Sequence, residues 1–180
     1  MPLAAESQVT ASEKLGIAID YFQGGKYHEA LLIMESLSEK YELNPRHRAY
    51  MGVCYYYDWQ YDKACMTLDS VMSQLEVFAP HERSVYYFTD AESHFELGQY
   101  REALPLYEQM TLVCHDNEKA DALYRMGFCY LNTGDKENAL EFFSSSLAYY
   151  LMFPDETKSG RMAQIRQMIA GLAQSLHRNN

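Results

Sequence analysis

The sequence predicts an all-α protein built from stacked helix–turn–helix units. A six-residue turn motif occurs four times in the 180 residues, at 25–30, 59–64, 98–103 and 134–139. The third position of each copy, on which the copies align, holds Tyr27, Tyr61, Tyr100 and Lys136. Successive copies therefore lie 34, 39 and 36 residues apart. A period near 34 residues is typical of stacked helix pairs. Because one such pair is too small to bury its own apolar face, each must pack on its neighbour.

This period divides the chain into a tail, four units and a final helix. Residues 1–10 show no apolar periodicity and are predicted to form a flexible tail. The four units are expected at about 11–44, 45–80, 83–116 and 119–153. Residues 154–180 are expected to form a capping helix, because a helical array needs a terminal element with one apolar and one polar face.

The first unit has recognisable signals at both ends. Thr10 or Ser12 is expected to cap its first helix, because a hydroxyl group accepts a hydrogen bond from an orphan backbone amide. The Gly24–Gly25 pair interrupts the helical pattern, and apolar residues at three- and four-residue spacing predict a second helix after it. Asn44–Pro45 ends the unit, since a residue that precedes proline disfavours the α conformation.

The second unit departs from the pattern in two ways. Trp59 occupies the turn position where the other three units have glycine, and we interpret it as a plug between units. The second helix is expected to hold apolar positions through Val71 and Met72. The extra residues of the 39-residue step lengthen either this helix or the exit loop that ends at Ala79–Pro80.

The third and fourth units and the final helix repeat the same outline. Pro105 is expected to kink or loosen the second helix of the third unit, because proline removes a backbone donor. Asp90 and His94 lie four residues apart in its first helix, and we interpret them as a polar pair that satisfies itself at a half-buried crossing. Phe153–Pro154 ends the fourth unit. The final helix carries one apolar stripe, formed by Met162, Ile165, Ile169, Leu172 and Leu176.

Composition excludes several classes of partner. The net charge of −10 argues against nucleic acid and against an anionic membrane surface, since both require Lys and Arg on the protein. No apolar run approaches the roughly 20 residues that cross a bilayer. Residues 1–14 lack the basic start and apolar centre of a secretory signal, so a cytoplasmic location is expected unless the chain is a mature form.

The sequence contains no recognisable catalytic or metal-binding motif. It has no HExxH motif, no glycine-rich phosphate loop and no Cys–His pair at a readable spacing. We therefore expect no enzyme activity, no cofactor and no metal site. The four cysteines form no CxxC pair and are expected to be buried free thiols, at Cys54, Cys65, Cys114 and Cys129.

The units resemble tetratricopeptide repeats, and the resemblance covers about residues 11–153. In that family a small residue in the first helix is followed three positions later by a large one, as in Gly52 with Tyr55 and Gly127 with Tyr130. The Gly-x-Tyr-x-x-Ala pattern that opens the second helix is also present. The third unit departs by pairing Ala91 with His94, and the fourth has lysine in place of the turn tyrosine.

The resemblance implies a right-handed superhelical array of antiparallel helix pairs whose first helices line a concave groove. Such a groove usually binds a peptide or helix of another protein. The inward-facing positions expected to contact that partner are Phe22, Tyr50, Val53, Tyr56, Tyr57, Phe88, Glu92, Phe95, Tyr124, Arg125 and Phe128. Aromatic side chains are suited to this role because they bury a large area with few rotatable bonds. For any one of them, a place in the core is equally compatible with the pattern.

The sequence favours a protein-binding adaptor and leaves two alternatives open. One is a structural or homo-oligomerisation module that associates through the outer aromatics Tyr149, Tyr150 and Phe153. The other is a chaperone similar to those of bacterial secretion systems, which shelters apolar segments of a client. The Lys and Asn residues with which some repeats grip a C-terminal carboxylate are missing here, so an apolar or extended partner segment is expected instead.

Overall fold

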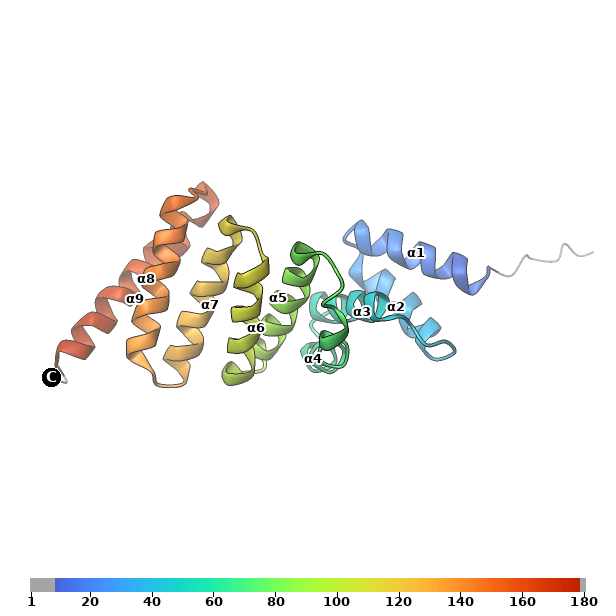
Figure 1. Cartoon of the computed structure of the whole chain (residues 1–180), viewed down its shortest axis with the longest axis horizontal. Coiled ribbons are helices and arrows are strands. Elements are labelled where there is room, and N and C mark those ends of the chain that lie inside the picture. The colour runs from blue at the N-terminus through green and yellow to red at the C-terminus, as the bar shows by residue number, and fades with distance from the viewer. Residues whose placement is uncertain (1–8, 179–180) are drawn as a thin grey trace, which may run out of the picture. The chain divides into compact units, whose positions relative to one another are not determined.

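The computed structural model describes residues 9–178 of the chain. Every regular element in that range is helical, which confirms the predicted all-α fold (Figure 1). The chain divides into two compact units, residues 1–74 and residues 75–180, and each is described by itself. Of the predicted tail, residues 1–8 lie outside the described part.

The first unit contains two helix pairs, in which each helix packs against the next along the chain. Its elements are α1 (Ala11–Gln23), α2 (Tyr27–Ser38), α3 (Pro45–Tyr57), α4 (Tyr61–Asp69) and the 3₁₀ turn η1 (Met72–Gln74). Its buried side chains come from facing sides of these helices, with Leu31, Cys54 and Ala64 in one cluster and Ala18 and Met34 in another.

Side-chain caps begin α1 and α3 where the sequence places them. Thr10 is the N-cap of α1: its hydroxyl accepts from the Glu13 amide at 3.2 Å, and the Glu13 carboxylate accepts from the Thr10 amide at 2.7 Å. This reciprocal capping box satisfies two amides that have no partner inside the helix. Asn44 caps α3 through a 2.9 Å bond from the His47 amide, and Pro45 occupies the first helical position, where proline is favoured.

Helix α4 is shorter than predicted. It ends at Asp69, so Val71 lies in a turn and Met72 lies in η1. The hydroxyl of Ser70 donates to the Thr67 carbonyl at 2.7 Å, a local bond of the kind that competes with helix continuation. The extra residues of the 39-residue step therefore lengthen the exit segment and leave the helix short.

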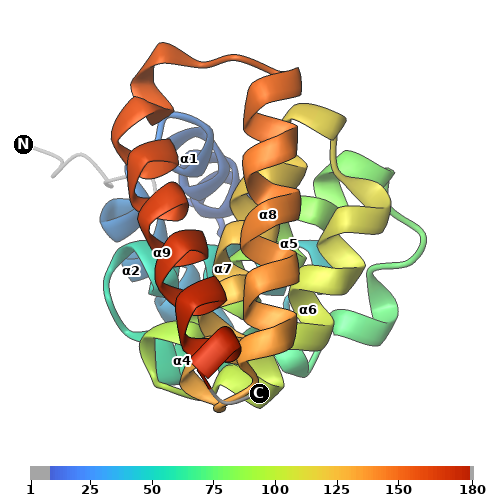
Figure 2. The same ribbon diagram turned by 90° about the vertical axis from the view of Figure 1, so that its left-hand side faces the viewer.

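The second unit is a run of five helices joined by tight connections. Its elements are α5 (Pro80–Glu96), α6 (Tyr100–Val113), η2 (Asp116–Glu118), α7 (Lys119–Asn132), α8 (Lys136–Met152), η3 (Glu156–Lys158) and α9 (Ser159–Arg178). Helix α6 continues through Pro105 without interruption. Figure 2 shows α9 running beside α8, against which it packs.

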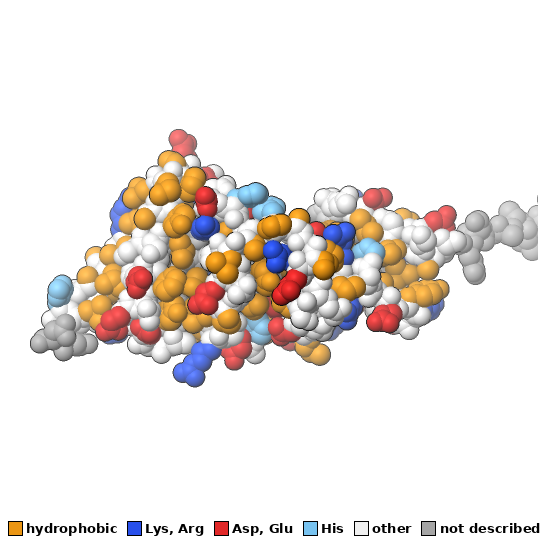
Figure 3. All heavy atoms as spheres, viewed as in Figure 1, with side chains coloured by type: hydrophobic (Ala, Val, Ile, Leu, Met, Phe, Trp, Pro, Cys, Tyr) orange, Lys and Arg blue, Asp and Glu red, His pale blue; other side chains and the backbone are white. Residues whose placement is uncertain are grey.

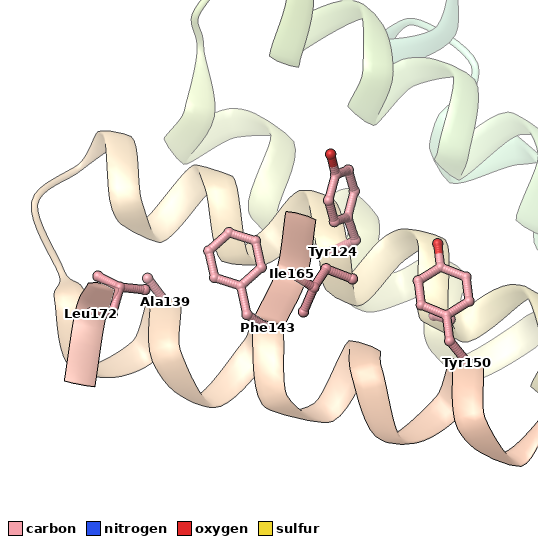
Figure 4. Packing of buried hydrophobic residues seen from close by; sticks show 7 residues of the cluster. Tyr124, Ala139, Phe143, Tyr150, Ile165 and Leu172 are labelled. Carbon is pink, nitrogen blue, oxygen red and sulfur yellow. The ribbon is translucent and has the colours of Figure 1, made fainter. Parts of the chain in front are cut away.

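The core of the second unit explains why α9 is needed. Phe143 of α8 and Ile165 of α9 are fully buried and share a cluster with Tyr124, Tyr150 and Leu172 (Figure 4). Half-buried apolar residues of the predicted α9 stripe pack against the same cluster. Helix α9 thus covers the apolar face of α7 and α8, as expected for a terminal cap.

Two glycines permit the closest helix–helix approaches. A Cβ atom built on Gly52 would lie 2.6 Å from Leu68 Cγ, and one built on Gly127 would lie 2.8 Å from ring carbons of Phe143. Both distances are shorter than real Cβ contacts. In these two helix pairs, the small residue predicted in the first helix is therefore required by the side chain that crosses it.

The four turns within the helix pairs share one hydrogen-bond pattern. In the first, the Gly25 amide donates to Phe22 and the Lys26 amide donates to Tyr21, at 3.1 and 2.8 Å. The same two bonds close the turns at Gly98 and Gly134. The turn residue is left-handed in each case, with φ of 73°, 72° and 87° at the three glycines. Glycine adopts this conformation without steric penalty.

Trp59 occupies the same position in the second turn. Its φ is 59°, its amide donates to the Tyr56 carbonyl at 3.0 Å, and the Gln60 amide donates to Tyr55 at 2.9 Å. The indole is 80% exposed, so the interpretation of Trp59 as a plug is wrong. In this left-handed conformation the Trp59 side chain points toward solvent.

Candidate functional site

In the first unit, the predicted contact residues form a connected series of aromatic rings. The Phe22 ring of α1 stacks on Tyr50 of α3 with centroids 4.3 Å apart, and its edge meets Tyr27 of α2 at 5.7 Å. Tyr27 in turn stacks on Tyr57 at 4.1 Å, and Tyr57 meets Tyr56 edge-on at 5.1 Å. Four of the predicted residues are thus brought together with Tyr27, which had not been singled out as a contact residue.

These residues differ in what they present to solvent. Tyr57 is 52% exposed, while Phe22, Tyr50 and Tyr56 are half-buried. Val53 is only 2% exposed and belongs to the core. A contact between the Val53 side chain and a partner is therefore incompatible with this structure. Val53 lies on the buried side of α3, whereas Tyr57 lies on its exposed side.

In the second unit, a buried carboxylate organises the predicted residues. Glu92 of α5 is almost fully buried, accepts from Arg125 of α7 at 2.6 Å and accepts from the Tyr107 hydroxyl of α6. The Arg125 guanidinium lies over the Phe95 ring, 4.5 Å from its centroid. Glu92 exposes little surface of its own, and it fixes Arg125 against the half-buried Phe95 ring.

The ionisation of this network follows from its burial and charges. Burial raises the pKa of Tyr107, and the adjacent Glu92 charge raises it further, so the phenol stays protonated and donates. Burial acts to lower the pKa of Arg125, but the Glu92 carboxylate outweighs it and the net direction is upward. Arg125 is therefore a permanent cation.

A small pocket of about 170 Å³ lies beside this network. Its walls come from α5, α7, η3 and α9, through Phe88, Glu92, Asp121, Arg125, Lys158 and Arg161. Lys158 Nζ lies 3.2 Å from both oxygens of Asp121, which also accepts from Arg161. The pocket thus presents an aromatic ring together with three cations and two carboxylates.

Lys158 and Arg161 were not among the predicted contact residues. Arg161 is adjacent to Met162 and four residues before Ile165, so its place at the edge of the apolar stripe was readable from the sequence. The position of Lys158 depends on η3, a three-residue turn with no periodic signal.

The fourth repeat unit is covered by the chain's own final helix. Tyr124 is buried, donates to Gln164 of α9 at 2.8 Å and lies under the Arg161 guanidinium at 4.7 Å. Phe128 meets Phe143 edge-on at 5.0 Å and stays half-buried. Of the two predicted aromatics, only Phe128 therefore retains surface for a partner.

A larger pocket of about 620 Å³ opens where α8 ends. It is lined by Asp121, Tyr150, Phe153 and neighbouring residues of η2 and η3. Tyr150 is 4% exposed and donates to Asp121 at 2.5 Å, so its interpretation as an outer aromatic is wrong. Tyr149 and Phe153 stack at 6.5 Å and remain half-buried.

The first unit has an apolar pocket of its own, of about 310 Å³. Leu15 of α1, Leu37 of α2 and the connection to α3, through Tyr41 and Leu43, line it. Figure 3 shows one face of the molecule, on which hydrophobic side chains occur in stretches with acidic side chains between them.

Asp90 and His94 lie beside each other, but at a crossing that is more deeply buried than predicted. His94 Nε2 lies 3.7 Å from Asp90 Oδ1, and the other ring nitrogen lies 2.6 Å from Gln99 Oε1. Both side chains are buried. No disulfide joins the four cysteines, of which Cys114 alone is half-buried rather than buried. Among the described residues, no helix combines the length and apolar character needed to cross a bilayer.

Comparisons with known proteins support the predicted repeat over part of the chain. Residues 94–150 match the family model described as tetratricopeptide repeat. Over 80 residues, or 44% of its length, the chain is 30% identical to the Photosystem I assembly protein Ycf3 of Rippkaea orientalis (strain PCC 8801 / RF-1). The aligned stretch spans 46% of that relative, so the chain matches less than half of its length.

Solved structures share the fold across most of the chain. A mutant of MamA superposes with a TM-score of 0.73 at 15% identity, covering 93% of this chain and 84% of that one. The tetratricopeptide-like repeats of a putative kinesin light chain from Podosopora anserina superpose with a TM-score of 0.63 at 16% identity, covering 93% and 86%. The predicted resemblance to tetratricopeptide repeat proteins is confirmed.

Proposed function

We propose that the chain is an adaptor that binds a segment of another protein, because residues 94–150 match a tetratricopeptide repeat model and the fold is shared with proteins built from such repeats. The fold is one that generally mediates protein–protein interaction. We further propose two separate contact surfaces for a partner, the aromatic series of the first unit and the pocket of the second. The predicted contact residues that keep exposed surface are Phe22, Tyr50, Tyr56, Tyr57, Phe88, Phe95, Arg125 and Phe128.

The observation that carries the proposal is the pocket beside Glu92. Phe88 and Arg125 come from different helix pairs and line one hollow. Arg125 is held by Glu92 and lies over Phe95, so its orientation is set before any partner arrives. A pre-positioned cation beside aromatic rings suits a partner residue with an apolar body and a polar or acidic tip.

The curated relative supports this reading of the function. It is named as an assembly protein, which is a role in which one protein brings others together. An adaptor that acts by binding needs no chemistry of its own, and we propose no enzymatic activity for this chain.

Site-specific photocrosslinking tests the proposal. A photoreactive phenylalanine analogue replaces Phe88 in one variant and Leu112 in the other; Leu112 is 75% exposed and lies at the end of α6. After irradiation in native lysate, we expect the variant with the probe at position 88 to crosslink to one defined protein. The variant with the probe at position 112 should not crosslink to that protein. Equal crosslinking from both positions would place binding elsewhere.

A double substitution separates the loss of binding from the loss of folding. Phe88→Ala combined with Phe95→Ala removes two half-buried rings and should abolish the crosslink obtained from a probe at Phe128. The helical circular dichroism signal and a cooperative melt should remain. Loss of the fold in this variant would show that the rings act mainly as core.

Self-association is the second candidate function. Leu151 and Met152 are both more than half exposed in the second unit, and exposed apolar side chains of this size favour a protein contact. Sedimentation at rising concentration tests it: a dimer weakened by Leu151→Ser supports this candidate, and a monomer at all concentrations removes it. Sheltering of an apolar client segment, as by a secretion-type chaperone, would use the same surfaces as the adaptor.

A further inference from the structure

The turn between α3 and α4 contains a residue that its backbone conformation disfavours. The equivalent positions in the other three turns are occupied by glycine, and all four turns close with the same pair of backbone hydrogen bonds. Trp59 takes the left-handed conformation at φ 59°. For a residue with a bulky side chain this conformation is strained, whereas glycine adopts it freely.

The fold gains little packing in return for this strain. The Trp59 indole is 80% exposed, more than any other exposed aromatic side chain among the described residues. Its neighbour Tyr57 is 52% exposed, and the Tyr57 ring is held in place by stacking on Tyr27 at 4.1 Å. Two aromatic rings therefore lie exposed at one turn. Strain that no packing explains is a reason to look for a function.

Charges around the turn indicate what the rings would bind. Asp58 lies 2.8 Å from His28 and 2.6 Å from the Gln60 amide, so its carboxylate is fixed at the turn. Asp62 is exposed in the first turn of α4. The nearest lysine in the sequence, Lys63, is directed over the Tyr55 ring, 5.3 Å from its centroid.

The first unit as a whole carries a net negative charge. Residues 1–74 contain ten Asp and Glu residues and six Lys and Arg residues. The indole face attracts cations more strongly than any other aromatic side chain. A guanidinium group both stacks on an aromatic plane and pairs with a carboxylate through parallel hydrogen bonds, which an ammonium group does not do.

We propose that Trp59, together with Tyr57 and Asp62, is a docking point for an arginine-bearing segment of a partner protein. The arginine guanidinium stacks on the indole and pairs with the carboxylate of Asp62. This surface belongs to the first unit and does not depend on the pocket beside Glu92. The docking point accounts for the presence of tryptophan in a turn that is built for glycine.

The chain reports on this site directly, because Trp59 is its single tryptophan. The probe is a synthetic acetyl-(Arg-Gly)₃ amide peptide, titrated while tryptophan emission is followed. The matched control is the same peptide with citrulline in place of arginine, which keeps the shape of the side chain and removes its charge. We expect saturable quenching or a shift with the arginine peptide and neither with the citrulline peptide.

A variant tests both sides of the inference at once. Trp59→Gly should weaken binding of the fluorescently labelled arginine peptide by about tenfold, the loss expected for one cation–π contact. The same variant should raise the melting temperature by about 2–4 °C, because the turn strain is relieved. Met66→Ala, which truncates another exposed apolar side chain of the unit, should change neither quantity.

Four results would overturn the proposal. Equal binding of the arginine and citrulline peptides would show that charge is not recognised. Unchanged binding by Trp59→Gly would remove the indole from the site, and a lower melting temperature in that variant would show that tryptophan supports the turn. Emission that shifts with protein concentration alone would identify a second copy of the chain as the occupant.

Discussion

Replacing Gly127 with alanine adds one methyl group at the closest helix crossing of the second unit. The new Cβ would lie 2.8 Å from two ring carbons of Phe143, whereas ordinary contacts begin at 3.4 Å. The Phe143 ring would have to withdraw by about 0.6 Å. It is fully buried and meets Phe128 edge-on at 5.0 Å, so it has little room to move.

Two opposing effects decide the size of the change. Overpacking a close crossing costs about 1–3 kcal/mol. Alanine in place of glycine in a helix interior contributes about 1 kcal/mol in the other direction. We expect Gly127→Ala to lower the free energy of unfolding by about 1 kcal/mol, and by at most about 2 kcal/mol, because the Phe143 ring has little room to withdraw and overpacking outweighs the gain in helix propensity.

Gly171→Ala is the matched control. Gly171 lies inside α9 of the same unit, and a Cβ built there has no heavy atom within 4 Å apart from its own helix surroundings. This substitution should raise the free energy of unfolding by about 0.5–1 kcal/mol through helix propensity alone. The same substitution, glycine to alanine, thus lowers the free energy of unfolding at position 127 and raises it at position 171.

Urea denaturation followed by far-ultraviolet circular dichroism measures both variants. With a denaturant slope of about 2 kcal/mol per molar, the midpoints should move apart by roughly 1 M. Adding Phe143→Leu to Gly127→Ala should recover part of the loss, because a smaller side chain then faces the new methyl group. Stabilisation of Gly127→Ala equal to that of Gly171→Ala would refute the steric account of the small residue in this helix.

Three further perturbations have definite expected outcomes. Thr10→Ala removes the capping box of α1 and should cost about 1 kcal/mol, measured by the same urea titration; an unchanged midpoint would mean that α1 frays in the wild type. Ellman's reagent at pH 8 should modify Cys114 first, because burial raises the pKa of Cys54 and Cys129 to about 12 and hides both thiols; fast reaction of all thiols would contradict their burial. Arg125→Met should lose about 3–5 kcal/mol because Glu92 is left as an unpaired buried charge, and Glu92→Gln in the same chain should restore much of it; additive losses would argue against the pair.

The sequence predicts the helices well because its signals there are local. The cap at Thr10, the proline at the start of α3 and the glycine turns depend on hydrogen bonds within a few residues, and the structure contains them. The length of α4 was predicted less well. Its end at Asp69 depends on a side-chain bond from Ser70 that apolar periodicity does not show.

The candidate site depends on contacts between helices, and there the sequence is less informative. Helical spacing places Val53 and Tyr57 on one helix, but it does not show that one is buried and the other exposed. Tyr124 lies on the predicted inner side, yet α9 covers it through Gln164 and Arg161. Which residues a capping helix conceals is determined by long-range packing, which the periodic pattern of a single sequence does not show.

Helices in each unit pack on their neighbours along the chain, and this arrangement governs how the protein acquires its structure. Contacts between adjacent elements close only short loops, so little chain entropy is lost before each contact forms. Proteins with such local contacts fold in microseconds to milliseconds. Helix pairs can form one after another, and opening can begin at the ends of a unit while its middle stays closed. Amide exchange should accordingly be faster in the helices that end a unit, such as α1 and α9, than in α2, α3, α6, α7 and α8, which have neighbours on both sides within their own unit.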